Sequence, residues 1–215
     1  MKKLIKMVSI LAVMSFMTAC QTAYYAAWEK LGVEKRDILV DRVEDARESQ
    51  EEAQQQFSSA LEQFSTLINF DGGELQRVYE QLSDEYESSK QAADDVAARI
   101  DSVENVAEAL FDEWQEELGN YSNANLRRDS ERQLKDTQRR YQTLIKAMRK
   151  VERSMEPVLA SLQDNVLYLK HNLNANAIGA LQGELNTIRK DVGRLIGEMN
   201  AAIEQSNAFI QSLNG

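Results

Sequence analysis

The sequence has very little of three residue types that commonly organise small folds. It contains one cysteine, Cys20, in 215 residues, so a disulfide within the chain is excluded and packing alone must hold the fold. It also contains one proline, Pro157, and only nine glycines, which leaves few residues that favour turns. A long chain with few turns is expected to form a small number of long elements.

Long apolar runs are also scarce, and the clearest one lies near the start of the chain. Three lysines, Lys2, Lys3 and Lys6, precede the mostly apolar residues 7–19. A membrane-spanning helix needs roughly 20 predominantly apolar residues, so this shorter stretch is not expected to remain as one. A basic start followed by a short apolar run is the layout of a bacterial secretion signal.

The residues around Cys20 predict that the secreted chain is cut and acylated. Met17, Thr18 and Ala19 directly before Cys20 resemble the lipobox of bacterial lipoproteins, although Leu is more usual where Met17 stands. That resemblance implies removal of residues 1–19 and a diacylated Cys20 held at a membrane; the alternative is a signal cut elsewhere or not at all. Gln21 is not the aspartate that usually favours the inner membrane in enterobacterial lipoproteins. We therefore expect the periplasmic face of the outer membrane.

Charge is distributed unevenly along the chain. The full chain has a net charge of −10, and loss of the three lysines with residues 1–19 leaves −13. Residues 21–120 hold 25 acidic and 8 basic residues, whereas residues 121–215 hold 10 and 14. An acidic body is repelled by nucleic acid and by anionic membranes, so neither is the expected main partner. The basic residues 127–153 are expected to lie against the acidic segment 75–118, with the phosphates of lipopolysaccharide or of anionic lipids as the alternative.

Heptad spacing of apolar residues predicts the fold. The seams run over residues 39–67, 75–118, 134–173 and 178–213, and the seam continues on both sides of Pro157. We expect an all-α fold, an elongated antiparallel four-helix bundle or paired coiled-coil hairpins, with a kink near Pro157. Residues 34–215 would form this single domain, after an aromatic lead-in over residues 20–33.

Some seam and helix positions break the apolar pattern. Polar residues are expected to fix register at four seam positions: Gln50, Ser89, Thr137 and Ser206. Four glycines lie within the expected last helix: Gly179, Gly183, Gly193 and Gly197. They indicate either close approach of a neighbouring backbone or local flexibility. Asp71 and Glu74 are spaced as a capping pair for the second helix.

Motifs that carry catalysis or bind cofactors are missing from the sequence. No HExxH, CxxC, GxSxG or phosphate-binding loop occurs. His171 is the sole histidine, and it and the neighbouring asparagines are expected to be cap or dipole partners at a helix end. Adjacent acids such as Asp94 and Asp95 fit a solvated helix face better than a calcium site. We expect no enzyme activity, no cofactor and no metal.

Four segments together carry a resemblance to a known family. They are residues 32–43, 69–73, 110–114 and 169–175, which span essentially all of the mature chain. In order and spacing they resemble a family of gammaproteobacterial-type proteins catalogued only as a domain of unknown function, many of which bear a lipobox. The resemblance implies an all-helical body and an envelope location, and it implies no mechanism.

Two functions are compatible with these features. The first is a non-enzymatic envelope lipoprotein that acts as a scaffold or adaptor, bound to the membrane through Cys20 and to an unidentified protein partner. The second is a carrier or chaperone for an apolar ligand such as a lipid. Five seam residues would line that site: Met148, Met155, Met199, Phe57 and Phe64.

Overall fold

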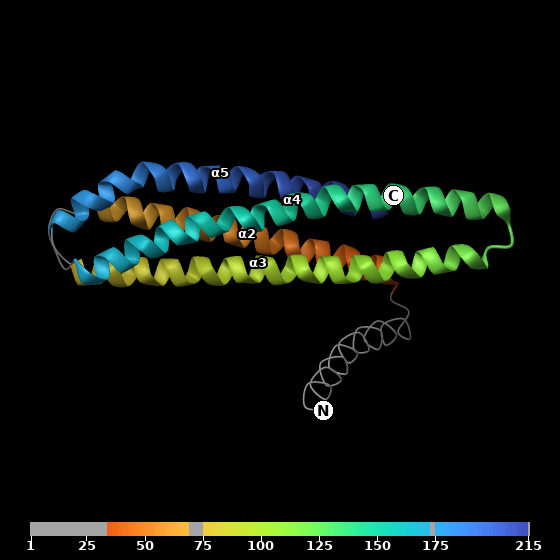
Figure 1. Cartoon of the computed structure of the whole chain (residues 1–215), viewed down its shortest axis with the longest axis horizontal. Helices are drawn as coiled ribbons and strands as arrows, with labels where there is room; N and C mark the ends of the chain where they lie inside the picture. The colour runs from red at the N-terminus through yellow and green to blue at the C-terminus, as the bar shows by residue number, and fades with distance from the viewer. Residues whose placement is uncertain (1–33, 69–74, 173–174, 215) are drawn as a thin grey trace, which may run out of the picture.

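The structure, a computed structural model, describes residues 34–68, 75–172 and 175–214. Within these ranges the chain forms four long α-helices and one short 3-10 helix. They are α2 (Lys35–Ile68), α3 (Leu75–Glu117), η1 (Leu118–Asn120), α4 (Ala124–His171) and α5 (Ala175–Asn214). The long helices lie side by side in an elongated bundle (Figure 1). The all-α bundle predicted from the seams is confirmed.

Contacts between helices establish an up-down-up-down arrangement. Arg47 of α2 bonds Asn207 of α5, and seven residues later Gln54 bonds Asn200, so the two helices run in opposite directions. Neighbours in sequence also pack as pairs, α2 with α3, α3 with α4 and α4 with α5, and α2 closes the ring against α5. Each long helix therefore covers two others, as the short connections lead one to expect.

The predicted seams form the core. On α2, eight of the nine expected seam residues are buried: Leu39, Val43, Ala46, Gln50, Ala53, Phe57, Ala60 and Phe64. The side chain of the ninth, Leu67, and the predicted capping pair Asp71 and Glu74 lie outside the described residues. Burial of such large apolar side chains is the main stabilising contribution, about 25 cal/mol for each Å² of apolar surface removed from water.

Helix α4 begins and ends at defined side-chain caps. Asn123 accepts hydrogen bonds from the backbone N–H groups of Asn125 (2.9 Å) and Leu126 (3.4 Å). The helix continues across Pro157 without a break, so no domain boundary lies there. It ends at His171, and the capping bonds come from Asn172, whose backbone and side-chain N–H groups donate to Leu169 and Tyr168. Asn172 is thus the cap, and His171 lies in the last turn of the helix.

The polar side chains at the seam positions differ in burial and in whether they have a hydrogen-bond partner. Gln50, Ser89 and Ser206 are fully buried, as predicted, whereas Thr137 is only half-buried. The Ser206 hydroxyl donates to the carbonyl oxygen of Ala202 at 3.0 Å. The side-chain amide of Gln50 and the hydroxyl of Ser89 have no hydrogen-bond partner among the described residues. These two groups lose their water without recovering a bond, which is costly.

The glycines of α5 face open space. A Cβ atom built at Gly179, Gly183, Gly193 or Gly197 would meet no heavy atom of a neighbouring segment within 4 Å. Close approach of a backbone therefore does not explain these glycines, and of the two interpretations only local flexibility is left.

Candidate functional site

Two of the long helices extend beyond the other two at one end of the bundle. Helices α3 and α4 contain 43 and 48 residues, compared with 34 in α2 and 40 in α5. Figure 1 shows them continuing past the start of α2 and the end of α5. Residues 114–140 make up this projecting hairpin, which we call the tip. We call the rest of the bundle, from the base of the tip to the opposite end, the four-helix section.

Contacts at the base of the tip show where α2 begins and where α5 ends against the other two helices. The first residue of α2, Lys35, forms an ion pair with Glu113 of α3 at 2.9 Å. Arg36 donates to the backbone carbonyl oxygen of Leu213, near the end of α5. Tyr141 packs between Phe111 and Phe209 with ring-centroid distances of 5.4 and 6.4 Å. Burial in this apolar contact raises the pKa of Tyr141 to about 12.

Few side chains hold the tip together. Leu118, Ser130 and Leu134 are buried between the two helices. The indole N–H of Trp114 donates to the Ser130 hydroxyl at 2.8 Å and links α3 to α4. At the turn, η1 follows the end of α3, and Asn123 caps the N-terminus of α4. The tip is therefore a short two-helix unit that depends on local bonds more than on a broad core.

The outermost turn of the tip has an unusual surface. Residues 118–128 contain no Asp or Glu, although the chain has 35 of them. Tyr121 and Leu126 are 42% and 55% exposed, large values for such side chains. Beside them, Arg127 and Arg128 make no ion pair with any described residue; Arg128 donates to the amide oxygen of Asn125 at 2.5 Å. Exposed apolar groups and cations without an ion pair among the described residues are thus adjacent in sequence.

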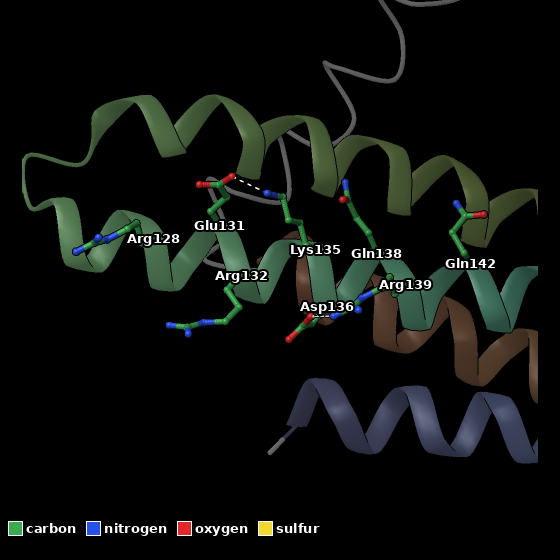
Figure 2. A pocket seen from close by; sticks show the side chains of 8 residues that line it. All are labelled: Arg128, Glu131, Arg132, Lys135, Asp136, Gln138, Arg139 and Gln142. Carbon is green, nitrogen blue, oxygen red and sulfur yellow. Dashed lines mark hydrogen bonds and ion pairs between the residues drawn. The ribbon is translucent and has the colours of Figure 1, made fainter.

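Behind this turn, the outer face of α4 bounds an open hollow of about 800 Å³ (Figure 2). It is lined by eight residues at helical spacing: Arg128, Glu131, Arg132, Lys135, Asp136, Gln138, Arg139 and Gln142. Lys135 pairs with Glu131 at 2.7 Å, and this hydrogen bond holds the pKa of Glu131 below its usual range. Arg139 pairs with Asp136. The cations of the hollow are thus largely compensated within α4.

Cations in the four-helix section pair differently. The Arg149 guanidinium donates to Asp101 at 2.6 Å, to Glu152 at 2.8 Å and to Glu104. The bonds to Glu104 and the other carboxylates raise the pKa of Arg149 above its usual range. The expected contact of residues 127–153 with the acidic segment 75–118 is therefore confirmed at Arg149.

The same expectation is wrong for the tip. Arg132, Lys135 and Arg139 pair with acids three or four residues earlier on α4 itself. Such partners are one turn away and need no alignment between helices, so they compete well with acids on α3. Lys150 lies in the four-helix section, and its partner is on neither α3 nor α4: it pairs with Glu198 of α5 at 3.4 Å.

The other residues singled out by sequence do not form a site with these. Cys20 lies outside the described residues. His171 is exposed at the last turn of α4, at the end opposite the tip. Asp94 and Asp95 lie on α3, and no group of three or more His, Cys, Asp or Glu side chains within the described ranges is placed to hold a metal ion. None of the helices in these ranges has the length and apolar character needed to cross a membrane.

The fold and the tip define an elongated helical bundle with one projecting hairpin. The chain belongs to the family described as a protein of unknown function, DUF2959, whose model matches residues 24–213. Comparison with curated proteins gives no match.

Proposed function

We propose that this protein is a non-enzymatic lipoprotein of the bacterial, gammaproteobacterial-type envelope, which serves as a scaffold or adaptor anchored through Cys20. The observation that carries the proposal is the position of Cys20. This single cysteine ends a signal-like segment and lies four residues before the match to the family model begins at residue 24. A removable signal would lie outside the family domain in just this way.

The shape of the described residues suits a scaffold. Helix α4 contains 48 residues, which correspond to about 70 Å at roughly 1.5 Å per residue. A lipid anchor contributes about 0.8 kcal/mol per buried CH₂, so two or three acyl chains would hold such a rod firmly. The rod would then carry a binding surface well away from its point of attachment, on the periplasmic face of the outer membrane.

A carrier for an apolar ligand is the second candidate. The residues proposed to line its binding site are part of the packed core. Met148, Met155 and Met199 are fully buried, as are Phe57 and Phe64. A ligand would have to separate the helices to reach them. Native mass spectrometry of the protein extracted from membranes distinguishes the two, because a carrier would show a bound lipid in addition to the acyl groups.

The test of the main proposal is metabolic labelling with a palmitate analogue in a Gram-negative host. We expect the wild type to be labelled and to fractionate with the outer membrane, and Cys20→Ala to lose both properties. Met17→Leu is the matched control, because Leu is the more usual residue at that position of a lipobox, and it should be labelled at least as well. An unlabelled wild-type protein in the cytosol would overturn the proposal.

A further inference from the structure

The exposed groups of the outermost turn lie close together in sequence at the end of the bundle. Tyr121 lies in the loop between η1 and α4, and Leu126 lies in the first turn of α4. Arg127 and Arg128 are the next two residues. Tyrosine, leucine and arginine side chains are found together where a protein contacts the headgroup region of a membrane. The apolar parts enter the interface, and the guanidinium groups bind phosphate.

We propose that the outermost turn of the tip, residues 118–128, docks on the phosphate-bearing surface of the membrane to which Cys20 is attached. Tyr121 and Leu126 enter the headgroup region, and Arg127 and Arg128 bind lipid phosphates. The inference rests on the proposed function for its anchor. It adds a second contact with the same membrane and sets the direction in which the rod points.

The start of α2, the described part of the chain nearest to Cys20, lies at the same end of the bundle as the tip (Figure 1). Lys35 pairs with Glu113, and α3 with η1 then runs on for only seven residues, about 10 Å at roughly 1.5 Å per residue. Cys20 precedes Glu34 by 14 residues, which span at most about 50 Å when fully extended. The level of the outermost turn is therefore within easy reach of the anchored cysteine.

The opposite end of the bundle also has exposed apolar side chains, but it is far from the start of α2. Leu167 and Tyr168 are 49% and 41% exposed near the end of α4. The 34 residues of α2 separate that end from Lys35 by about 50 Å. The tether from the anchored cysteine therefore reaches the outermost turn with most of its length to spare, whereas it reaches the opposite end only when residues 20–34 are almost fully extended, so the tip is the favoured membrane contact.

The charges around the outermost turn permit this contact. Asp129 pairs with Arg132, and Glu131 pairs with Lys135, so the nearest acids on α4 are compensated. Glu116 and Glu117 are exposed on α3, behind η1. Screening has a length of about 8 Å at physiological salt, which limits repulsion from the more distant acidic body. The anchor also raises the effective concentration of the tip at the surface, so modest attraction is sufficient.

Fluorescence quenching on the acylated protein tests the orientation. Because Cys20 is blocked by its lipid, a cysteine introduced at Ala124→Cys or at Lys170→Cys is the one thiol available for a fluorophore, at the tip or at the opposite end. Each labelled protein is placed in phosphatidylcholine vesicles with and without phosphatidylglycerol, and the vesicles carry a headgroup quencher. We expect several-fold stronger quenching at residue 124 than at residue 170, and a further increase with phosphatidylglycerol.

A matched pair of variants identifies the residues responsible. Leu126→Gln with Arg127→Gln and Arg128→Gln should reduce quenching at residue 124 to the level seen at residue 170. Leu167→Gln with Lys170→Gln, the equivalent change at the opposite end, should leave quenching at residue 124 unchanged. All five side chains are exposed, so both variants should retain the helical circular dichroism of the parent.

The outcomes separate the inference from the function on which it rests. An acylated protein with weak quenching at both positions would place the tip away from the membrane, and equal strong quenching would mean that the rod lies flat; either result overturns the inference and leaves the anchor intact. If Cys20 is not acylated, the proposed function fails. The labelled Cys20→Ala chain, added to the same vesicles, then still reports whether the tip variant reduces quenching, and no reduction would overturn the inference.

Discussion

Helices α3 and α4 run through two regions of the molecule that differ in how many neighbours cover them. In the four-helix section, α2 and α5 complete a closed ring, and the seam residues of α3 from Val96 to Ala107 are almost fully buried. In the tip, a side-chain hydrogen bond between helices, from Trp114 to Ser130, joins α3 and α4 to each other. There the seam residue Trp114 is partly exposed and Thr137 is half-buried. Burial along the seam is therefore less complete in the tip, although Leu118 and Leu134 are buried there as well.

Ion pairs show the same division. Arg149 joins α4 to two carboxylates of α3, Asp101 and Glu104, in the four-helix section. In the tip, Arg132 and Arg139 bond acids on their own helix. Pairs within one helix contribute only about 0.2–0.5 kcal/mol each and do not hold two helices together. We therefore expect the tip to open locally well before the four-helix section unfolds.

The largest expected effect comes from emptying the core in each region with the same substitution. Leu195 in the four-helix section is 0% exposed and Leu134 in the tip is 2% exposed. Leu195→Ala should lower the free energy of unfolding by about 3–5 kcal/mol, because surrounding helices cannot collapse into the cavity. Leu134→Ala should cost less, about 2 kcal/mol, because the tip can relax toward solvent.

Urea unfolding combined with amide hydrogen exchange checks this pair. Leu195→Ala should shift the global transition, and Leu134→Ala should mainly speed exchange in residues 114–140. Equal shifts of the global transition by both variants would show that the tip and the four-helix section unfold as one unit, and the expected difference in stability between them would be wrong.

The second prediction increases stability in the four-helix section. Gln50 is fully buried, and neither its amide nitrogen nor its amide oxygen has a hydrogen-bond partner among the described residues. Gln50→Leu should raise the free energy of unfolding by about 1–3 kcal/mol, since the desolvation penalty of the amide is removed. The change is measured by chemical denaturation of the two proteins side by side.

Ser206→Ala is a matched control for that variant, because the Ser206 hydroxyl is equally buried but donates to Ala202. Its replacement should be neutral or destabilising. A Gln50→Leu protein that is less stable, or that changes its oligomeric state, would indicate that Gln50 sets the register of the bundle, as polar seam residues do in coiled coils.

The core of the bundle was predictable from the sequence because heptad spacing depends on local geometry. Leu39, Val43 and Phe57 recur with the period of a helix face, and a long run of such residues can be buried only against other helices. The helix ends were less predictable. Asn172 and His171 are neighbours with similar capping ability, and only the backbone conformation at the end of α4 shows which one acts.

The tip was not predictable in the same way, because its existence depends on where the other helices start and stop. The predicted seams already differ in length, 39–67 being shorter than 75–118, but the alignment that puts the start of α2 beside Glu113 depends on how the helices pack. The absence of acids in residues 118–128 was a visible signal. Its meaning required the exposure of Tyr121 and Leu126, which results from the lack of covering helices.

The third prediction weakens the tip alone. Asn123→Ala removes the side chain that accepts from the N–H groups of Asn125 and Leu126, and loss of such a cap costs about 1 kcal/mol. Hydrogen exchange should accelerate in the first turns of α4, while the midpoint of thermal unfolding changes little. Asn123→Ser should restore protection because serine caps as well, and a variant in which it does not would rule out capping as the cause.

The smallest expected effect strengthens the four-helix section without touching the tip. Gly193 lies on the exposed face of α5, where an added Cβ meets no atom within 4 Å. Gly193→Ala should raise the free energy of unfolding by about 0.4–1 kcal/mol, because alanine loses less backbone freedom on folding. The reverse change on the same helix, Ala201→Gly at another exposed position, should lower it by a similar amount. Because α5 covers only the four-helix section, exchange rates in residues 114–128 should remain unchanged in both variants, and faster or slower exchange there would mean that the two regions are energetically coupled.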